Sequence, residues 1–125
     1  MLIELFEFVI SPAEKEVNGA VYTPQYVREF IVQGCFDNFP LDDWRNLRIA
    51  DISCGCGGFF ISIAEYLKNK IDTTYYDIYN HLYGVDIEEY SIERTKILLT
   101  LYAIQNGEDI EDFTFNLFCG NSLNF

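Results

Sequence analysis

Residues 51–60 read Asp-Ile-Ser-Cys-Gly-Cys-Gly-Gly-Phe-Phe, and this stretch decides the fold. The short apolar run Leu47–Ile52, which leads into the glycines, is typical of a buried strand. After the glycines, apolar residues recur at helical spacing from Phe60 to Leu67, which predicts an amphipathic helix. A strand that turns through glycines directly into a helix lets the backbone pass close to a ligand.

A second helix is predicted upstream of this turn. Thr23-Pro24 indicates its start, with Thr23 as the N-cap and Pro24 in the first helical position. We expect Gly34 to end the helix and residues 37–46 to form a loop. The apolar residues expected on its buried face are Val27, Phe30 and Ile31.

Two further strands and a long helix are predicted downstream. Residues 69–80 are expected to form an irregular, exposed insertion, and His81–Asp86 to form a strand that ends in an acid. A helix is predicted over Glu88–Gln105, and the alternation of Phe113–Leu117 predicts a third strand. The apolar residues expected on the buried face of the long helix are Ile97, Leu98, Leu101 and Ile104.

Strands that alternate with helices indicate a parallel sheet. We therefore expect a three-layer α/β domain of the doubly wound, Rossmann-like type, with its first three parallel strands and their flanking helices in this chain. In the usual strand order the first strand lies in the middle of the sheet, so three strands alone would leave its outer edge bare. Residues 1–18 are expected to be an N-terminal connection and residues 19–125 half of a larger domain.

The composition favours a folded protein in the cytoplasm. Half of the residues are hydrophobic, yet we expect neither a signal peptide nor a membrane span. We expect the four cysteines to be reduced thiols. Their spacing is not that of a metal site, and His81, the one histidine, has no second histidine to pair with as a ligand. The net charge of −12 excludes a DNA-gripping surface built from this chain's own net field.

Two acids frame the glycine turn: Asp51 before it and Asp86 at the tip of the second strand. A carboxylate at that tip is placed to accept both hydroxyls of a ribose. A dinucleotide fingerprint needs a small residue where Phe60 stands, and no Lys-Ser/Thr pair follows the glycines as in a P-loop. An acidic site repels a pyrophosphate but attracts a sulfonium cation. S-adenosylmethionine, which carries a ribose and a sulfonium, therefore fits both the ribose-binding carboxylate and the negative charge of the site.

Four segments resemble, in order and spacing, the motifs of the N6-adenine DNA methyltransferases of bacterial restriction–modification systems. They are Gly19–Ile31, Asp51–Phe59, Gly84–Glu88 and Cys119–Leu123. The closest similarity is to the gamma-type order of type I modification subunits and fused restriction-methylation enzymes. The resemblance implies S-adenosylmethionine as cofactor, DNA bound through parts of the protein outside this chain, and a specificity or restriction subunit as a candidate partner.

The resemblance also implies a role for individual residues. Tyr22-Thr23-Pro24 would hold the methionine portion of the cofactor, and the glycine turn would wrap it. Asp86 would bind the ribose and Ile87 would lie against the adenine ring. Asn121 stands where the family usually has an Asp that contacts the adenine amino group, and its amide oxygen is also an acceptor. The full set is Tyr22, Thr23, Pro24, Asp51, Ser53, Cys54, Gly55, Gly57, Asp86, Ile87 and Asn121.

The family's catalytic motif is Asn or Asp followed by Pro-Pro and an aromatic residue, and it binds the flipped target adenine. We expect it shortly after Leu123, but no Pro-Pro occurs in the chain. No catalytic residue is therefore expected here, and this chain alone is expected to be inactive. Two alternatives stay open: methyl transfer to RNA or to a protein amide, and a non-catalytic scaffold subunit that keeps the fold.

Overall fold

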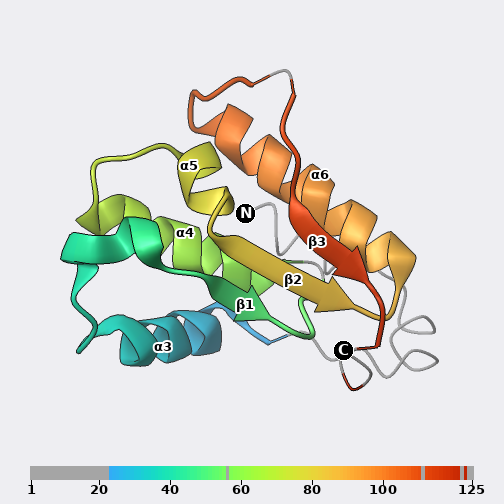
Figure 1. The fold of residues 1–125 in the computed structure, drawn as a ribbon, viewed down its shortest axis with the longest axis horizontal. Helices are drawn as coiled ribbons and strands as arrows, with labels where there is room; N and C mark the ends of the chain where they lie inside the picture. Colours follow the sequence, from blue (N-terminus) through green and yellow to red (C-terminus); the bar gives the residue numbers. More distant parts are fainter. Residues whose placement is uncertain (1–22, 56, 111, 122, 124–125) are drawn as a thin grey trace.

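The computed structural model describes residues 23–55, 57–110, 112–121 and 123 (Figure 1). Its three strands are parallel and form one sheet in the order β1-β2-β3, which confirms the predicted α/β fold. The strands are β1 (Ile49–Asp51), β2 (Leu82–Asp86) and β3 (Asn116–Cys119). Among the described strands β1 has one partner, β2, so its other edge is free as expected. The predicted connection, residues 1–18, lies outside the described residues.

The helices lie on one side of this sheet (Figure 1). They are α3 (Gln25–Phe36), the 3₁₀ helix η1 (Leu41–Asn46), α4 (Gly58–Lys70), α5 (Tyr75–Tyr79) and α6 (Glu89–Gln105). Helices α4 and α6 connect β1 to β2 and β2 to β3. Because both connections step across the sheet in the same direction, right-handed crossovers place both helices on the same face. The described residues thus form two of the three layers that the sequence predicted.

Burial along the strands agrees with this arrangement. Leu82 and Leu117, on the face toward the helices, are buried. On the opposite face, Ala50 and Phe118 are exposed, because no described helix covers them. The hydrophobic core therefore lies between the sheet and the helices α4 and α6. Because the strands are parallel, the residues that follow β1 and β2 lie at the same edge of the sheet.

Helix α3 differs from its prediction at both ends and in its buried face. It begins at Gln25, with Pro24 in the N-cap position, and it continues past Gly34 to Phe36. A Cβ at Gly34 would meet nothing within 4 Å, so this glycine is an ordinary, open helical position. The predicted buried face was wrong at Phe30 and Ile31, which are exposed. The side chains buried where α3 packs on α4 are Arg28, Val32 and Phe36, spaced four residues apart.

The prediction of an exposed, irregular insertion over residues 69–80 was wrong. Helix α5 forms there, and the Oγ1 atom of Thr74 caps it by accepting a hydrogen bond of 3.0 Å from the Asp77 N–H. The Glu108 carboxylate accepts further hydrogen bonds from the first two N–H groups of the helix. The helix forms because its three tyrosines are all buried, and their rings supply the apolar area that orders it.

Helix α6 is rotated about its axis relative to its prediction. Leu98 is buried as expected, but Ile97, Leu101 and Ile104 are exposed. The buried residues of this helix are Ser91, Ile92, Thr95, Leu98, Leu99 and Ala103. Apolar residues occur around most of the helix, so their spacing alone does not indicate which side packs on the sheet.

Strand β3 begins three residues later than predicted, at Asn116. Phe113 and Phe115 precede it and pack against the α5 tyrosines: their ring centroids lie 5.0 Å from Tyr76 and 6.1 Å from Tyr79. The apolar alternation was therefore real, but its first half serves the aromatic cluster and only its second half pairs with β2.

Candidate functional site

The carboxyl ends of the parallel strands meet at one edge of the sheet, where open α/β sheets bind ligands. Asp51 ends β1 opposite Gly84, and Asp86 ends β2 opposite Cys119. The glycine turn that follows β1 lies at this edge, and the arrowheads in Figure 1 point toward the same side as the start of α3. Asp51, Asp86 and Cys119, which come from three of the four motif segments, therefore lie at this edge.

Asp86 joins the second strand to the glycine turn. Its Oδ2 atom accepts a hydrogen bond of 2.9 Å from the N–H of Gly55, and its Oδ1 atom accepts one of 2.9 Å from the N–H of Glu88. The N–H of Cys54 donates to the Val85 carbonyl at 3.0 Å and continues the contact between turn and strand. Each carboxylate oxygen can accept a second hydrogen bond, so Asp86 retains acceptor capacity for a ligand.

The turn itself needs its glycines. Gly55 and Gly57 have φ angles of 54° and 87°, in the left-handed region that only glycine enters without strain. A Cβ atom on Gly57 would also lie 2.8 Å from Cγ2 of Thr95. The Thr95 hydroxyl donates to the Gly55 carbonyl at 2.8 Å. The turn is therefore closed by α6 as well as by β2, a contact that the sequence analysis did not foresee.

Arg28 is a second residue that the sequence analysis missed. Its side chain is 2% exposed and donates from Nη1 to the carbonyl of Thr23. A Cβ atom on Gly58 would lie 3.0 Å from Cδ of Arg28, so the glycine makes room for this side chain. Arg28 thereby links the Thr-Pro segment before α3 to the start of α4. The sequence signal that could have identified it is its spacing: Arg28 lies four residues before Val32, so both side chains are on the buried face of α3.

The electrostatics of the turn are those of a partly buried acidic site. Burial raises the pKa of Asp51, the nearby Asp86 raises it further, and the hydrogen bond from the Ser53 N–H partly opposes both. Burial, followed by the charges of Asp86 and Asp51, raises the pKa of the Cys54 thiol to about 12. Cys54 is therefore an unreactive, protonated thiol at neutral pH, and the site as a whole favours a cationic ligand group.

Ile87 and the end of β3 complete the edge. The Ile87 side chain is 68% exposed, so an apolar surface is available beside the carboxylate of Asp86. The N–H of Gly120 donates to the Asp86 carbonyl at 2.9 Å, which brings the following Asn121 to the same edge. The Asn121 Oδ1 atom accepts a hydrogen bond of 3.0 Å from the N–H of Leu123. Its side chain is exposed.

The predicted site residues are thus gathered by the fold in one region, with one exception. Asp51, Ser53, Cys54, Gly55, Gly57, Asp86 and Ile87 belong to one hydrogen-bonded edge, Thr23 and Pro24 are tied to it through Arg28, and Asn121 follows through Gly120. Tyr22 lies outside the described residues. Within the part of the chain that the structure describes, no three His, Cys, Asp or Glu side chains are grouped to hold a metal ion.

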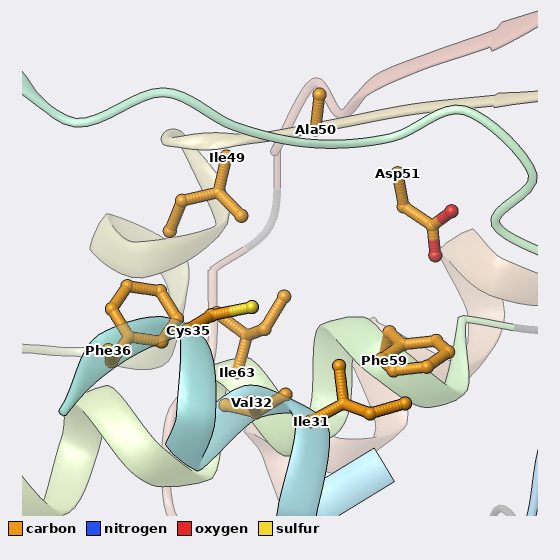
Figure 2. Close-up of a pocket in the computed structure, with 9 residues that line it drawn as sticks. All are labelled: Ile31, Val32, Cys35, Phe36, Ile49, Ala50, Asp51, Phe59 and Ile63. Atoms are coloured by element: carbon orange, nitrogen blue, oxygen red, sulfur yellow. The ribbon is translucent and has the colours of Figure 1, made fainter.

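A pocket of about 270 Å³ lies next to this edge, between α3, β1 and α4 (Figure 2). Its wall is apolar, and Ile49 and Asp51 point into it from β1 while Ala50 points away. The other lining residues are Ile31, Val32, Cys35, Phe36, Phe59 and Ile63. Of the predicted site residues, Asp51 is the one that also lines this pocket. The pocket therefore lies mainly along the free edge of β1.

Comparison with known families decides what this arrangement belongs to. Residues 1–124 match the model of the N-6 DNA methylase family. The chain belongs to this family. The match confirms the resemblance drawn from the four motifs, which lie in the order and spacing of the N6 DNA methyltransferases of restriction–modification systems.

Individual relatives agree with the family. A protein of Methanocaldococcus jannaschii that bears the name of a type II restriction enzyme and methyltransferase is 35% identical, over 66% of this chain and 9% of that protein. The fold is similar to that of a type I modification subunit from Vibrio vulnificus, with a TM-score of 0.66, 21% identity and coverage of 98% of this chain and 23% of that one.

A second solved structure, a type ISP restriction–modification enzyme bound to DNA, has a TM-score of 0.64 and 20% identity. It is matched over 96% of this chain and 9% of its own. The chain therefore spans between about a tenth and a quarter of the length of these relatives. At this level of identity, the two solved structures establish the fold.

Proposed function

We propose that this chain is the S-adenosylmethionine-binding part of a site-specific DNA adenine-N6 methyltransferase of a restriction–modification system. The observation that carries the proposal is the hydrogen bond between Asp86 and the N–H of Gly55, at the carboxyl edge of the sheet. It holds a carboxylate with free acceptor capacity directly beside Gly55, which has no side chain. That combination suits a ligand with a ribose and a polar, cationic tail.

The residues present fit this cofactor in three respects. Asp86 offers lone pairs to ribose hydroxyls, and the exposed side chain of Ile87 offers an apolar surface to an adenine ring. Asp51 and Asp86 together give the negative field that favours an amino group or a sulfonium. The turn and the Thr23-Pro24 segment, held together by Arg28, would enclose the methionine portion.

Each part of the chain has a defined task in this proposal. S-adenosylmethionine supplies an electrophilic methyl group on a sulfonium when it is bound. This chain's own residues bind and orient the cofactor, and the Asp86 carboxylate accepts the hydrogen bonds of the ribose. The groups that bind the flipped adenine lie in other parts of the protein, so the transfer depends on positioning across the two parts.

DNA is the proposed substrate, and the charge of this chain bears on how it is bound. A net charge of −12 gives no phosphate-binding field, so the DNA contacts belong to other parts of the protein. A specificity or restriction subunit is a further proposed partner, and a DNA-modifying enzyme would work in the cytoplasm. Among the described helices, none combines the length and the apolar character that crossing a membrane requires.

A binding experiment with S-adenosylhomocysteine, the demethylated product, tests the proposal. We expect saturable binding by isothermal titration calorimetry, and a loss of about a hundredfold or more in affinity for Asp86→Ala, since hydrogen bonds to a charged acceptor contribute roughly 1.5–3 kcal/mol each. Asp72→Ala, which removes an exposed carboxylate between α4 and α5, is the matched control and should bind like the wild type.

The substrate class is tested separately. The full-length protein should transfer a labelled methyl group from S-adenosylmethionine to adenine in duplex DNA, and not to RNA or to protein amides. No heat of binding at millimolar ligand, or equal affinity of the Asp86→Ala and wild-type proteins, would contradict the cofactor assignment. Methyl transfer to RNA or protein would keep that assignment and replace the substrate, whereas binding without transfer to any of them would favour the scaffold alternative.

A further inference from the structure

Thr95 touches the glycine turn from α6 at two points. The residue is fully buried, with 0% of its surface exposed. Its Oγ1 atom lies 2.8 Å from the Gly55 carbonyl and 2.8 Å from the Ser91 carbonyl. The hydroxyl has one proton, and in an α-helix the Ser91 carbonyl already accepts the N–H of Thr95. The Gly55 carbonyl is therefore the acceptor that depends on this hydroxyl.

The hydrogen bonds hold both polar groups of Gly55. Its N–H donates to Asp86 on β2, and its carbonyl accepts from Thr95 on α6. Together they fix the two peptide planes on either side of a residue whose φ is 54°. Without them, a glycine has many conformations of similar energy. The turn is thus preorganised by two elements that are 31 and 40 residues away along the chain.

The methyl group of Thr95 adds a steric constraint. Cγ2 lies 2.8 Å from the position that a Cβ of Gly57 would occupy. The methyl group therefore packs directly against the backbone of the turn at its second left-handed glycine. A smaller residue at position 95 would leave room there, whereas a residue of equal size without a hydroxyl would keep the packing and remove only the hydrogen bond.

We propose that Thr95 is a positioning residue for cofactor binding, which acts by holding the Gly55 carbonyl and so keeping the glycine turn in its binding-competent conformation. The inference rests on the proposed function. Thr95 touches the turn and not the ligand. Loss of its hydroxyl therefore lowers the fraction of molecules in which the turn has its binding-competent conformation. Apparent affinity falls by the same fraction, while the chemistry at full occupancy is unchanged.

The decisive variant is Thr95→Val, which keeps the shape and removes the hydroxyl. In the full-length protein we expect affinity for S-adenosylhomocysteine to fall roughly tenfold, as for the loss of one hydrogen bond to a partly buried carbonyl. The KM for S-adenosylmethionine should rise by a similar factor, with kcat at saturating cofactor within twofold of the wild type. Thr95→Ser, which restores the hydroxyl, should recover most of the affinity.

Thr100→Val is the matched control. The Thr100 hydroxyl makes the same kind of bond, 2.8 Å to the Lys96 carbonyl of its own helix, and makes no hydrogen bond to the described residues of the turn. Its loss should leave cofactor affinity unchanged. Amide exchange gives an independent readout without cofactor: the Gly55 N–H should exchange faster in Thr95→Val than in Thr100→Val. If Thr95→Val does not fold, Thr95→Ser and Thr95→Ala, which both lack the methyl group and differ only in the hydroxyl, carry the comparison.

The outcomes separate the two proposals. A wild-type protein that binds no S-adenosylhomocysteine overturns the proposed function and this inference together. Wild-type binding with unchanged affinity in Thr95→Val overturns the inference alone. Equal losses in Thr95→Val and Thr95→Ser, or a loss in kcat without a change in KM, also overturn it, because the hydroxyl would then not be the group that positions the turn.

Discussion

At the scale of single residues, the glycines of the turn differ in what they permit. Gly57 lets the backbone pass against Thr95, and Gly58 lets Arg28 lie across the start of α4. Gly107 has a φ of 86°, close to that of Gly57, but a Cβ there would meet nothing within 4 Å. The turn is therefore a place of close approach between α3, α4 and α6 as well as a place of unusual backbone conformation.

This difference predicts the effect of replacing each glycine by alanine. Gly107→Ala should lower the free energy of unfolding by about 1–2 kcal/mol, the cost of a left-handed non-glycine residue. Gly57→Ala should cost roughly 1–3 kcal/mol more, since its Cβ also overlaps Cγ2 of Thr95. Urea unfolding monitored by circular dichroism measures both values.

Gly34→Ala provides a control of opposite sign. It lies at an open position in the last turn of α3, where alanine favours the helix by up to roughly 1 kcal/mol, so this variant should be more stable than the wild type. Similar losses for Gly57→Ala and Gly107→Ala would mean that the contact with Thr95 can relax without cost.

At the scale of elements, α5 owes its existence to the aromatic rings around it. Tyr75 packs edge-on against Tyr102 of α6, with ring centroids 5.3 Å apart, and Tyr79 lies near Phe113 and Phe115. A helix of five residues is too short to be stable by itself. Its order comes from partners that are distant in sequence, which is why local composition predicted an exposed insertion.

Two buried tyrosines of α5 give a matched test of this cluster. The Tyr79 hydroxyl donates to the Leu99 carbonyl at 2.9 Å, whereas the buried Tyr76 hydroxyl has no hydrogen-bond partner among the described residues. Tyr79→Phe should therefore destabilise the protein by about 1 kcal/mol or more, and Tyr76→Phe should be neutral or stabilising. Thermal unfolding by calorimetry measures the difference, and a larger loss for Tyr76→Phe would contradict this account of α5.

At the scale of the whole molecule, helices cover one face of the sheet, and no helix among the described residues covers the other. The connections all step from β1 toward β3, so their helices accumulate on one side. The open face carries Ala50 and Phe118, and the free edge of β1 lies beside the apolar pocket of Figure 2. Exposed apolar surface of this kind favours association.

We therefore expect the 125-residue chain by itself to self-associate and to bind the dye ANS. Phe118→Lys, on the open sheet face, should reduce both properties, as measured by sedimentation velocity and by fluorescence. Ile97→Lys on α6 is the control, since Ile97 is equally exposed, at 51% against 52% for Phe118, but lies away from the sheet. A larger effect of Ile97→Lys would assign the association to α6 instead.

The sequence by itself determined the order of the three strands and of the helices α3, α4 and α6, and the acids at the ends of β1 and β2. These features are local: a strand, a glycine turn and a helix are encoded within about twenty consecutive residues, and Asp86 follows from the end of one apolar run. The motif order was also sufficient to identify the family.

The tertiary structure alone decided which side of α6 is buried, that α5 is a helix, and that Arg28 and Thr95 hold the candidate site. The reason is physical. Gly55 depends on Asp86 and Thr95, which are 31 and 40 residues away, and contacts over such separations leave no periodic signal in the chain. Local spacing placed the acids and glycines along the chain, and long-range packing brought them together.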